Sequence, residues 1–472
     1  MNRNRLIIFT LAVGLIAGGL RFFRLGDWPF AGDELATFSE ADALLKRHNN
    51  SLASQDDRLP RMIPLSHLTH SVGYYVFGRG EYGSRVLLAL FGTATVVIVF
   101  LSLGKLISWP TALIVSGLMA LWPEHLFQSQ QNRFYIVAAF FSTLCMLSGA
   151  QAIVRRGVGW PFISCLFGFA GLLSHSLQIV LLPGLFMGWL VGAWIGRRPL
   201  PWRSLGMVSF AGLLAGVFVL LYLAPLAQGW NSGSSWGYSS GRALLASLLQ
   251  IGWPVVLLGM VGAASFWKER SAQGIYWLVW AGVWLLASAV FPQFVAYHPS
   301  YVFPLALAPF VLAGRGAAHI YELLRPASTL TATAWIAAVL CFSLPNVASF
   351  YRDGSRYDFR TAARYIDKHL QPGDRIAAIS SGTLKYYMSC SEPIIGLPDS
   401  NPLSSLKELS KSPGRLWIVL QCGRAGYASD LDHWLGLHCF HELKVRAVRF
   451  DYYDFTVNVF LCAPACDDQT TE

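Results

Sequence analysis

Side chains that could carry chemistry lie in four separate connecting segments of this 472-residue sequence. Carboxylates can accept protons and guanidinium groups can bind anions, so segments that contain both are candidates for a site. The members of this set are Asp33, Glu34, Asp56, Asp57, Glu81, Arg85, Glu124, His125, Arg133, His175, Tyr297, His298 and Tyr301. The sequence contains no Walker loop, no H-E-x-x-H helix, no G-x-S-x-G turn and no dinucleotide fingerprint. A site made of these residues must therefore be assembled by the fold.

Taken singly, these residues also have purely structural explanations. Asp33 precedes a helical pattern and could cap that helix. Glu81 and Arg85 are four residues apart and could form a pair on a helix surface. His175 could be a hydrogen-bonded residue at a membrane interface, and Gln130 could help to close a tight hairpin. Only the convergence of the four segments would indicate a site.

The elements that must position these residues are long and apolar. The composition is 54% hydrophobic and 13% charged, whereas soluble proteins contain about 25% charged residues. This excludes disordered, collagen-like and nucleic-acid-binding proteins, which could not solvate so much apolar surface. A membrane helix needs about 20 predominantly apolar residues. We predict eleven spans, at 6–23, 85–106, 109–127, 133–153, 160–175, 177–195, 204–224, 244–266, 275–291, 300–314 and 329–348.

The positive charge of the chain, +10 overall, is confined to its hydrophobic part. Residues 1–348 contain 22 basic and 11 acidic residues, whereas residues 349–472 contain 14 and 15. If the N-terminus lies inside, the inside loops contain twelve Lys or Arg residues and the short outside loops only Arg133 and Arg242. Basic inside loops are typical of membrane proteins. The charge therefore indicates an orientation, not an acidic partner such as nucleic acid.

This orientation predicts a protein of the inner (cell) membrane with a cytoplasmic N-terminus. The odd number of spans places the C-terminal residues in the periplasm or outside the cell. We predict a transmembrane domain over 1–348, in which 24–84 is a large periplasmic loop with surface helices, and a separate domain over 349–472. The first apolar run continues to Phe23 without an A-x-A-like cleavage site, so we expect a retained helix and not a signal peptide.

The C-terminal residues have the pattern of a soluble α/β domain. Three apolar runs predict strands and three amphipathic stretches predict helices; the strands are 376–379, 416–420 and 456–461, and the helices 358–370, 401–410 and 429–437. In the first loop, apolar spacing predicts a surface helix that starts at Asp33 and a second helix over 63–77. Five cysteines lie in the tail, where disulfides can form, but the sequence does not determine their pairing. Cys462 and Cys466 alone make only a weak zinc motif.

The order of these pieces resembles the GT-C membrane glycosyltransferases, which include the dolichyl-phosphate-mannose–protein mannosyltransferases and the bacterial lipid A aminoarabinose transferase. The family's Asp-Glu pair in the first loop is matched by Gly32-Asp33-Glu34-Leu35-Ala36. Its Ser-Gln-x-x-Arg-x-Tyr hairpin is matched by Ser129-Gln130-Gln131-Asn132-Arg133-Phe134-Tyr135, the most specific of the matches. Looser matches are 63–78 followed by Glu81 and Arg85, then 173–175 and 300–304. The resemblance covers about residues 5–315.

The resemblance implies a polytopic helical fold and transfer of a sugar from a polyprenyl-phosphate donor to a hydroxyl of a cell-envelope glycan, lipid or protein, with inversion at the sugar. It implies Asp33 as catalytic base and Glu34 as supporting acid or second base. It implies donor-phosphate ligands at Arg133, Arg85 and His298, and substrate contacts from Asp57, Glu81, Gln130, Tyr135, His175 and Tyr301. The sequence departs from the family at two places. The family has Arg at the position of Ser300, and it has His-Pro-Pro in the part of the first loop that corresponds to 61–64.

These implied roles agree with elementary physical chemistry. A carboxylate that is partly desolvated at membrane depth becomes more basic, which suits removal of a proton from an acceptor hydroxyl. Guanidinium groups at the interface would stabilise the charge that develops on the leaving phosphate. The identities of the sugar and the acceptor depend on loop shapes and are not predicted.

A metal ion and two other functions stay open at this point. Asp33 with Asp56 or Asp57 could bind a divalent cation, although no spacing demands one. A transporter or flippase for a lipid-linked glycan would have ionisable groups near mid-membrane and repeats between its halves, but here the charges gather at one face and no repeat is visible. A non-catalytic membrane assembly protein with an outside α/β domain is the remaining alternative. Sugar transfer that depends on Asp33 would separate the enzyme from both.

Overall fold

The structure is a computed structural model that describes residues 2–49, 64–155, 157–197, 201–223, 239–294, 298–354, 356–390, 392–398, 401–422, 428–447 and 454–463. The described residues form two compact units. A helical unit takes its residues from 1–23, 40–79 and 83–347, and an α/β unit from 24–39, 80–82 and 348–472. Two pieces of the first loop therefore belong to the α/β unit, which hydropathy did not predict.

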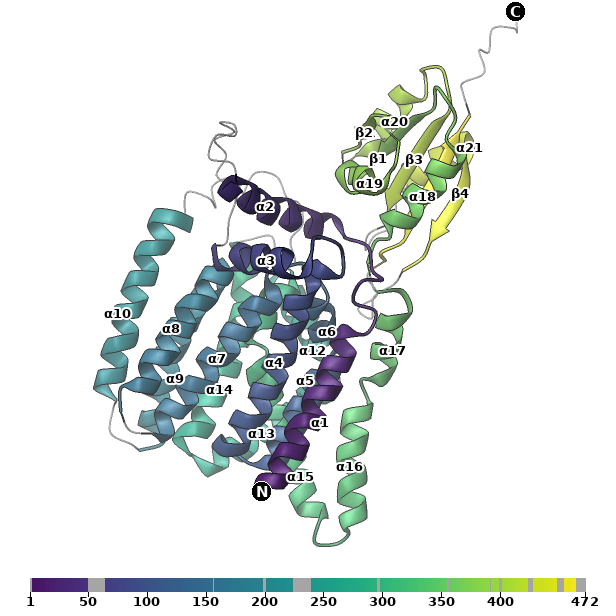
Figure 1. Ribbon diagram of the computed structural model, residues 1–472. Coiled ribbons are helices and arrows are strands. Elements are labelled where there is room, and N and C mark those ends of the chain that lie inside the picture. Colours follow the sequence, from purple (N-terminus) through teal and green to yellow (C-terminus); the bar gives the residue numbers. More distant parts are fainter. Residues whose placement is uncertain are drawn as a thin grey trace, which may run out of the picture. The chain divides into compact units, whose positions relative to one another are not determined.

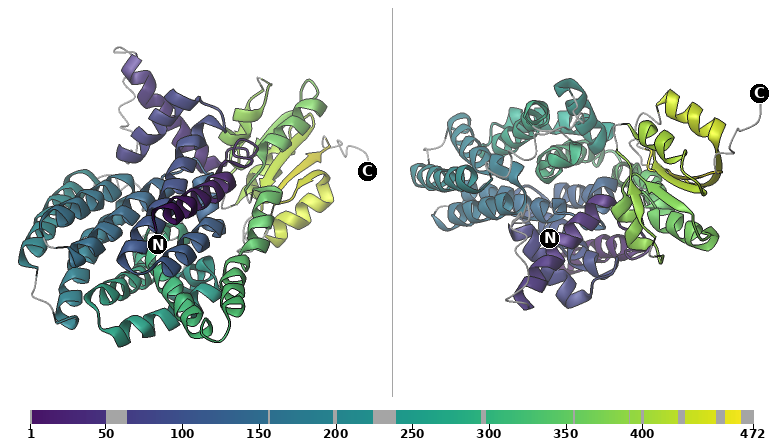
Figure 2. Two further views of the ribbon diagram at one scale, coloured as in Figure 1. Left: turned by 60° about the horizontal axis from the view of Figure 1, so that its bottom comes forward. Right: turned by 90° about the horizontal axis from the view of Figure 1, so that it is seen from above.

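The helical unit contains long helices that run side by side, joined by shorter helices and turns (Figures 1 and 2). They are α1 (Arg3–Phe22), α3 (Pro64–Phe77), α4 (Gly83–Leu106), α5 (Trp109–Leu121), α6 (Pro123–Ser129), α7 (Tyr135–Val154), α8 (Gly159–Ser174), η1 (Ser176–Val180), α9 (Leu181–Ile195), α10 (Trp202–Phe218), η2 (Val219–Leu223), α12 (Ser240–Ile251), α13 (Trp253–Glu269), α14 (Ala272–Val290), η3 (Phe291–Gln293), η4 (Pro299–Tyr301), η5 (Phe303–Leu305), α15 (Leu307–Leu324) and α16 (Thr329–Cys341). The two predicted first-loop helices are present as α2 (Gly32–Asn49) and α3.

Most of the predicted spans are helices of sufficient length and apolarity. Among the described residues, eight helices could cross a membrane, and a ninth span exists if a bent pair counts as one. The predicted runs at 109–127 and 160–175 contain shorter apolar helices, α5 and α8. The count of eleven therefore stays a prediction.

One predicted span has the wrong shape. The run 244–266 was expected to be a single helix, but α12 and α13 meet at an angle of 93°. Gly252, between them, has φ +89°, a backbone conformation that glycine adopts without the steric cost of a side chain. Pro254 follows in the first turn of α13, where its missing N–H costs no helical hydrogen bond.

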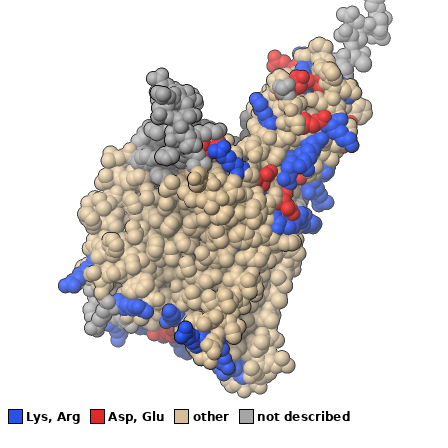
Figure 3. Space-filling model, viewed as in Figure 1, with Lys and Arg blue, Asp and Glu red and all other residues tan. Residues whose placement is uncertain are grey.

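The flank of the helical unit is suited to lipid. Large apolar side chains point outward along it; Leu15 of α1 is 75% exposed, and Leu213 of α10 is also exposed. In the view of Figure 3, Lys and Arg side chains gather at one end of this unit and its flank is uncharged. An exposed apolar surface of this extent requires a non-aqueous environment. The protein is an integral membrane protein.

The α/β unit contains a five-stranded mixed sheet. Its strands are β1 (Arg375–Ala378), β2 (Ile394–Gly396), β3 (Leu416–Gln421), β4 (Cys439–Val445) and β5 (Val457–Cys462), in the order β2-β1-β3-β5-β4. Strand β1 pairs in parallel with β2 and β3, whereas β5 pairs antiparallel with β3 and β4. The helices of the unit are α17 (Leu344–Asp353), which starts within the helical unit, α18 (Phe359–His369), α19 (Ser381–Tyr387), α20 (Pro402–Leu409) and α21 (Ser429–His438).

Helices cover both faces of this sheet (Figure 2). Alternate strand residues such as Ile418 pack with α20 and α21, and their neighbours such as Val419 pack with α18 and α19. Burial on both faces explains why β3 reads as a continuous apolar run. The predicted strands and helices of the tail are present, but α19, β2 and β4 were not predicted.

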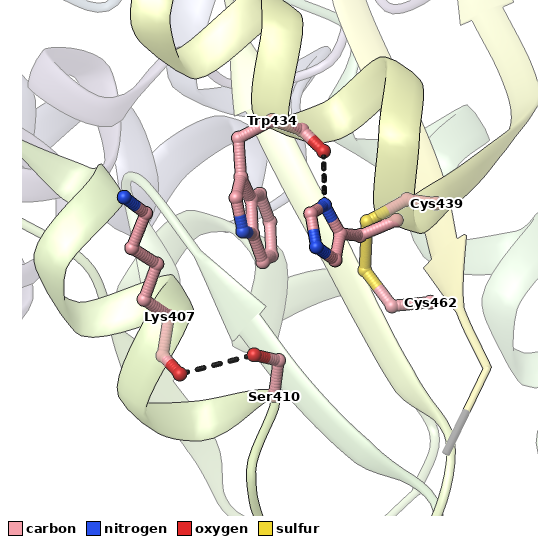
Figure 4. The surroundings of a disulfide bond; sticks show 6 residues. Lys407, Ser410, Trp434, Cys439 and Cys462 are labelled. Atoms are coloured by element: carbon pink, nitrogen blue, oxygen red, sulfur yellow. Dashed lines mark hydrogen bonds between the residues drawn. A yellow bond between two sulfur atoms is a disulfide. The ribbon is translucent and has the colours of Figure 1, made fainter. Parts of the chain in front are cut away.

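A disulfide joins the two antiparallel strands at the edge of the sheet. Cys439 at the start of β4 and Cys462 at the end of β5 form it, beside Trp434 of α21 (Figure 4). In the same view the Ser410 hydroxyl donates a hydrogen bond of 3.0 Å to the Lys407 carbonyl oxygen at the end of α20. The pairing, which the sequence left open, is thus explained by strand register. Cys466 lies outside the described residues.

Candidate functional site

The hairpin between α6 and α7 is fixed from two sides. The Gln130 side-chain amide donates hydrogen bonds to the carbonyl oxygens of Arg21 (2.9 Å) and Phe23 (3.0 Å) at the end of α1. These bonds satisfy carbonyl groups that have no partner within the helix. On the other side, the Tyr74 hydroxyl of α3 donates to the Asn132 side-chain oxygen at 2.9 Å. Gln130 therefore anchors the hairpin, and its predicted substrate contact stays a prediction.

Four predicted site residues and Phe134 come together just after this hairpin. We call this group the Arg133 cluster; its members are Arg133, Tyr135, His175 and Tyr301, which were predicted, and Phe134, which was not. The Arg133 guanidinium lies 4.5 Å from the centre of the Phe134 ring and 6.0 Å from that of Tyr135. The Tyr135 and Tyr301 rings are stacked at 6.3 Å, and the His175 ring lies 5.6 Å from Tyr135 and 5.8 Å from Tyr301. Three of the four predicted segments thus contribute side chains to this cluster.

A hydrogen-bonded network adjoins the cluster through η4. The Ser300 hydroxyl lies 3.2 Å from a carboxylate oxygen of Glu124 and 3.0 Å from Nδ1 of His298. The Gln128 amide donates to the same Glu124 oxygen at 2.6 Å and to the Ser300 hydroxyl at 3.2 Å. Ser300 precedes Tyr301 in the chain, so this network and the Arg133 cluster share one turn. His298, a predicted phosphate ligand, therefore lies next to the cluster, held by Ser300.

Gln128 and Arg21 also take part in these contacts, although neither was predicted from the sequence. Gln128 is four residues after Glu124 on α6, a spacing that could have indicated the contact. Arg21 is fully buried in the last turn of α1, where its guanidinium lies 2.8 Å from Nδ1 of His125. A side chain at Gly92 of α4 would overlap the Ser129 hydroxyl and crowd Arg21. Glycine at this position therefore lets α4 approach the buried polar groups.

The two acidic residues of the first loop have opposite environments in the α/β unit. Asp33, in the first turn of α2, has an exposed side chain. The Glu34 carboxylate is fully buried, accepts a hydrogen bond from the Ala31 amide at 3.1 Å, and pairs with the Arg356 guanidinium at 3.2 Å. Arg356 was not predicted, because nothing in its local sequence distinguishes it from a surface arginine.

Glu81 also belongs to the α/β unit. It accepts a hydrogen bond of 3.0 Å from the Tyr387 hydroxyl, and the Arg360 guanidinium lies 3.6 Å away. Burial, together with the charges of Glu81 and Glu34, raises the pKa of Tyr387 well above its ordinary value. Tyr387 therefore stays protonated at any physiological pH and acts as a hydrogen-bond donor to Glu81. Arg85 belongs to the helical unit and is fully buried in the first turn of α4.

The remaining predicted residues concern metal and substrate binding. Asp56 and Asp57 lie outside the described residues, as does Tyr297. Within the part of the chain that the structure describes, no three His, Cys, Asp or Glu side chains are grouped so that they could hold a metal ion.

Comparison with known proteins identifies the fold. No family model matches the sequence, and no curated protein matches it either. Among solved structures, ArnT from Cupriavidus metallidurans in the apo state has a TM-score of 0.59 at 14% identity, over 96% of this chain and 97% of that chain. The same protein bound to undecaprenyl phosphate has a TM-score of 0.56 at 14% identity, over 98% of both chains. This chain shares the ArnT fold.

A second solved structure has the same arrangement over most of this chain. The Archaeoglobus fulgidus oligosaccharyltransferase in complex with zinc and sulfate has a TM-score of 0.55 at 14% identity, over 88% of this chain and 68% of that chain. The prediction of a polytopic helical GT-C-like fold with a C-terminal α/β domain is therefore confirmed. A shared fold does not by itself establish a shared reaction.

Proposed function

We propose that this protein is a glycosyltransferase that moves a sugar from a polyprenyl-phosphate donor to a hydroxyl group of a cell-envelope glycan, lipid or protein. The observation that carries this proposal is the Arg133 cluster, in which a guanidinium is held against aromatic rings beside His298. A cation with aromatic neighbours suits a ligand whose charged phosphate joins an apolar lipid tail. The likeness in fold to ArnT, solved with undecaprenyl phosphate, supports the same class of donor.

We assign proton removal to Asp33. Its side chain is exposed and can meet an acceptor, whereas the Glu34 carboxylate is buried and paired with Arg356. The same Glu34 oxygen is bonded by the Ala31 amide and by Arg356, and burial keeps an acceptor away from the carboxylate, which disfavours Glu34 as a second base. Glu34 therefore serves the structure around Asp33 and not the transfer of a proton.

The proposed reaction is a single displacement. The acceptor oxygen forms a bond to the anomeric carbon while the bond from that carbon to the phosphate oxygen breaks, and the electron pair of the broken bond stays on the phosphate. Asp33 takes the acceptor proton, and Arg133 and His298 stabilise the negative charge that the leaving phosphate gains. Attack from the face opposite the leaving group inverts the anomeric carbon.

We place the reaction at the outer face of the membrane. Helix α7 begins two residues after Arg133 and ends at Val154, directly before Arg155 in the connection from α7 to α8. At about 1.5 Å per residue, its 20 residues match the hydrocarbon thickness of a bilayer. Basic residues at the far end of such helices favour a cytoplasmic position for that end. With the eleven predicted spans, the N-terminus is then cytoplasmic and the C-terminal domain periplasmic or extracellular.

Sugar transfer in membranes tests the proposal. A radiolabelled polyprenyl-phosphate sugar is supplied to membranes that contain the protein, and transfer into glycan, lipid and protein fractions is measured. We expect transfer with the wild type and with Lys268→Gln, a substitution in the exposed last turn of α13, but not with Asp33→Asn. Full turnover by Asp33→Asn would overturn the assignment of the base. Lipid and glycan mass spectrometry of a deletion strain then identifies the missing sugar and its acceptor.

A further inference from the structure

The start of α2, which carries Asp33, packs within the α/β unit through apolar contacts. Phe30 is fully buried, and its ring lies 5.8 Å from that of Tyr386. Trp28 is also buried, 6.3 Å from Phe350, and it packs directly against Gly354 (φ +69°), where a side chain would overlap its ring. These residues are more than 300 positions apart in the sequence. The segment before Asp33 is therefore part of the core of the C-terminal domain.

Hydrogen bonds also hold the same segment to the helices of the α/β unit. The Tyr387 hydroxyl accepts a hydrogen bond of 2.5 Å from the Phe30 amide and donates one of 3.0 Å to Glu81, so one phenol ties both pieces of the first loop. The Arg360 guanidinium donates to the Asp27 carbonyl oxygen. The Arg24 guanidinium donates to the Tyr351 carbonyl oxygen at 2.6 Å.

A buried ion pair lies directly beside Asp33. Arg356 donates to Glu34 at 3.2 Å, with the arginine side chain 2% exposed and the carboxylate fully buried. One residue before Asp33, Gly32 lies beside α19, where a Cβ on Gly32 would be 3.4 Å from the Thr383 hydroxyl. Of the two neighbours of Asp33 in the chain, Glu34 is thus held by the C-terminal domain and Gly32 lies beside it, while Asp33 itself has an exposed side chain.

We propose that the C-terminal α/β domain is the positioning element of the catalytic carboxylate, with Arg356 and Tyr387 as its positioning residues. This inference rests on the proposed function, because it assigns a role toward Asp33 as base. The domain presents Asp33 as a fixed feature of its own surface, and the first-loop segment stays docked on the domain throughout turnover. A misplacement of about 1 Å can cost two orders of magnitude in rate, so rigid support of this kind matters for catalysis.

A disulfide trap tests whether the segment stays docked. Gly32→Cys combined with Thr383→Cys in the full-length protein brings two thiols within reach, because the Cβ-to-hydroxyl distance of 3.4 Å is close to that required for a disulfide. We expect the double variant in native membranes to cross-link on mild oxidation, as shown by mass spectrometry of the linked peptides. We expect the cross-linked protein to retain sugar transfer within about twofold of the same variant before oxidation. Each single variant, treated identically, controls for oxidation itself.

The outcomes of this trap separate the two proposals. Failure to cross-link, or loss of transfer on cross-linking that reduction reverses, would overturn the positioning role while the proposed function stands. Absence of sugar transfer in the wild type would overturn the proposed function and the positioning role together, whether or not the cross-link forms.

Removal of the Tyr387 hydroxyl tests Tyr387 as a positioning residue. Tyr387→Phe deletes the group that joins Phe30 to Glu81, and we expect kcat to fall about tenfold or more with KM for the donor unchanged. Tyr365→Phe is the matched control, since its hydroxyl donates at 2.9 Å to Glu442 of the same domain, away from the first loop. We expect Tyr365→Phe to leave kcat unchanged. Equal effects of both variants, or a change confined to KM, would overturn the role of Tyr387.

Discussion

The carboxylate of Glu34 and the guanidinium of Arg356, 322 residues apart in the sequence, form an ion pair with 3.2 Å between Oε2 and Nη1. Both side chains are buried within the α/β unit, whereas the adjacent Asp33 is exposed. Neighbouring residues of a helix point in directions about 100° apart, which lets one carboxylate enter the core while the next remains accessible. The Asp-Glu pair therefore combines a structural acid with an accessible one.

This pair should dominate the stability of the segment that carries Asp33. Arg356→Gln leaves a buried carboxylate without its cation, and we expect the free energy of unfolding of the α/β unit to fall by about 3–5 kcal/mol. The double variant Glu34→Gln with Arg356→Gln should recover much of this loss. Hydrogen exchange of peptides from the α/β unit, in the purified full-length protein, measures both.

An exposed ion pair of the same unit provides the control. Asp27 pairs with Arg24 at 2.7 Å with side chains 52% and 36% exposed, so Asp27→Asn should cost at most about 1 kcal/mol. Equal losses for Arg356→Gln and Asp27→Asn would contradict the importance of the buried pair.

Arg133 should be essential for sugar transfer but not for folding. Arg133→Gln removes the cation that we assign to the leaving phosphate, and kcat/KM for sugar transfer should fall about 100-fold. Arg133→Lys retains the charge but loses the planar group that lies over the Phe134 ring, so it should recover only part of the activity. Transfer assays in membranes with equal amounts of each variant measure this. Wild-type rates for Arg133→Gln, with Lys268→Gln as control, would exclude Arg133 from the phosphate site.

The sequence predicted elements that depend on local pattern. Long apolar runs predicted the membrane helices, and the apolar run of β3 predicted a strand buried on both faces. The bend at Gly252 escaped prediction because hydropathy is continuous across it, although the backbone is not. β4 was missed because it begins directly after α21 without a turn residue, and its residues are mostly exposed.

Four residues of the Arg133 cluster were predictable because their positions also follow from local sequence pattern. Arg133, Tyr135, His175 and Tyr301 lie at helix ends, and the order of helices along the chain suffices to bring such ends together. Arg356 and Tyr387 support Asp33 from a domain more than 300 residues away, through tertiary contacts that leave no periodic trace in the sequence. Only the folded arrangement distinguishes them from ordinary surface residues.

The α/β unit should lose stability at low pH through Asp374. Burial opposes ionisation of this carboxyl, but hydrogen bonds from Arg415, the Gln371 amide and Trp417 outweigh it and hold its pKa below the ordinary value. A carboxyl group whose pKa is lowered by folding makes its full contribution to the free energy of unfolding above its unfolded pKa of about 3.9. This contribution is lost as pH falls through the lower pKa of the folded state.

The wild type should therefore exceed Asp374→Asn in stability near pH 6, and the difference should shrink as pH falls below about 4. Thermal unfolding of the full-length protein at several pH values measures this difference. Asp432→Asn, which alters an exposed carboxylate of α21, should change stability by less than about 0.5 kcal/mol. A difference for Asp374→Asn that grows toward acid would reverse the sign and contradict the prediction.

The Cys439–Cys462 disulfide should reveal the side of the membrane on which the C-terminal domain folds. Disulfides form in the periplasm and outside the cell but are rare in the cytoplasm, where thiols are kept reduced. If the domain is outside, cells are treated with a thiol-blocking reagent before lysis, and their membranes should yield the linked peptides that contain Cys439 and Cys462. Cys145 and Cys165, which are buried in the helical unit, should be recovered as unlinked thiols after denaturation and so control for adventitious oxidation. Recovery of Cys439 and Cys462 as free thiols would instead indicate a cytoplasmic domain, and would reverse the proposed orientation together with the face at which sugar transfer takes place.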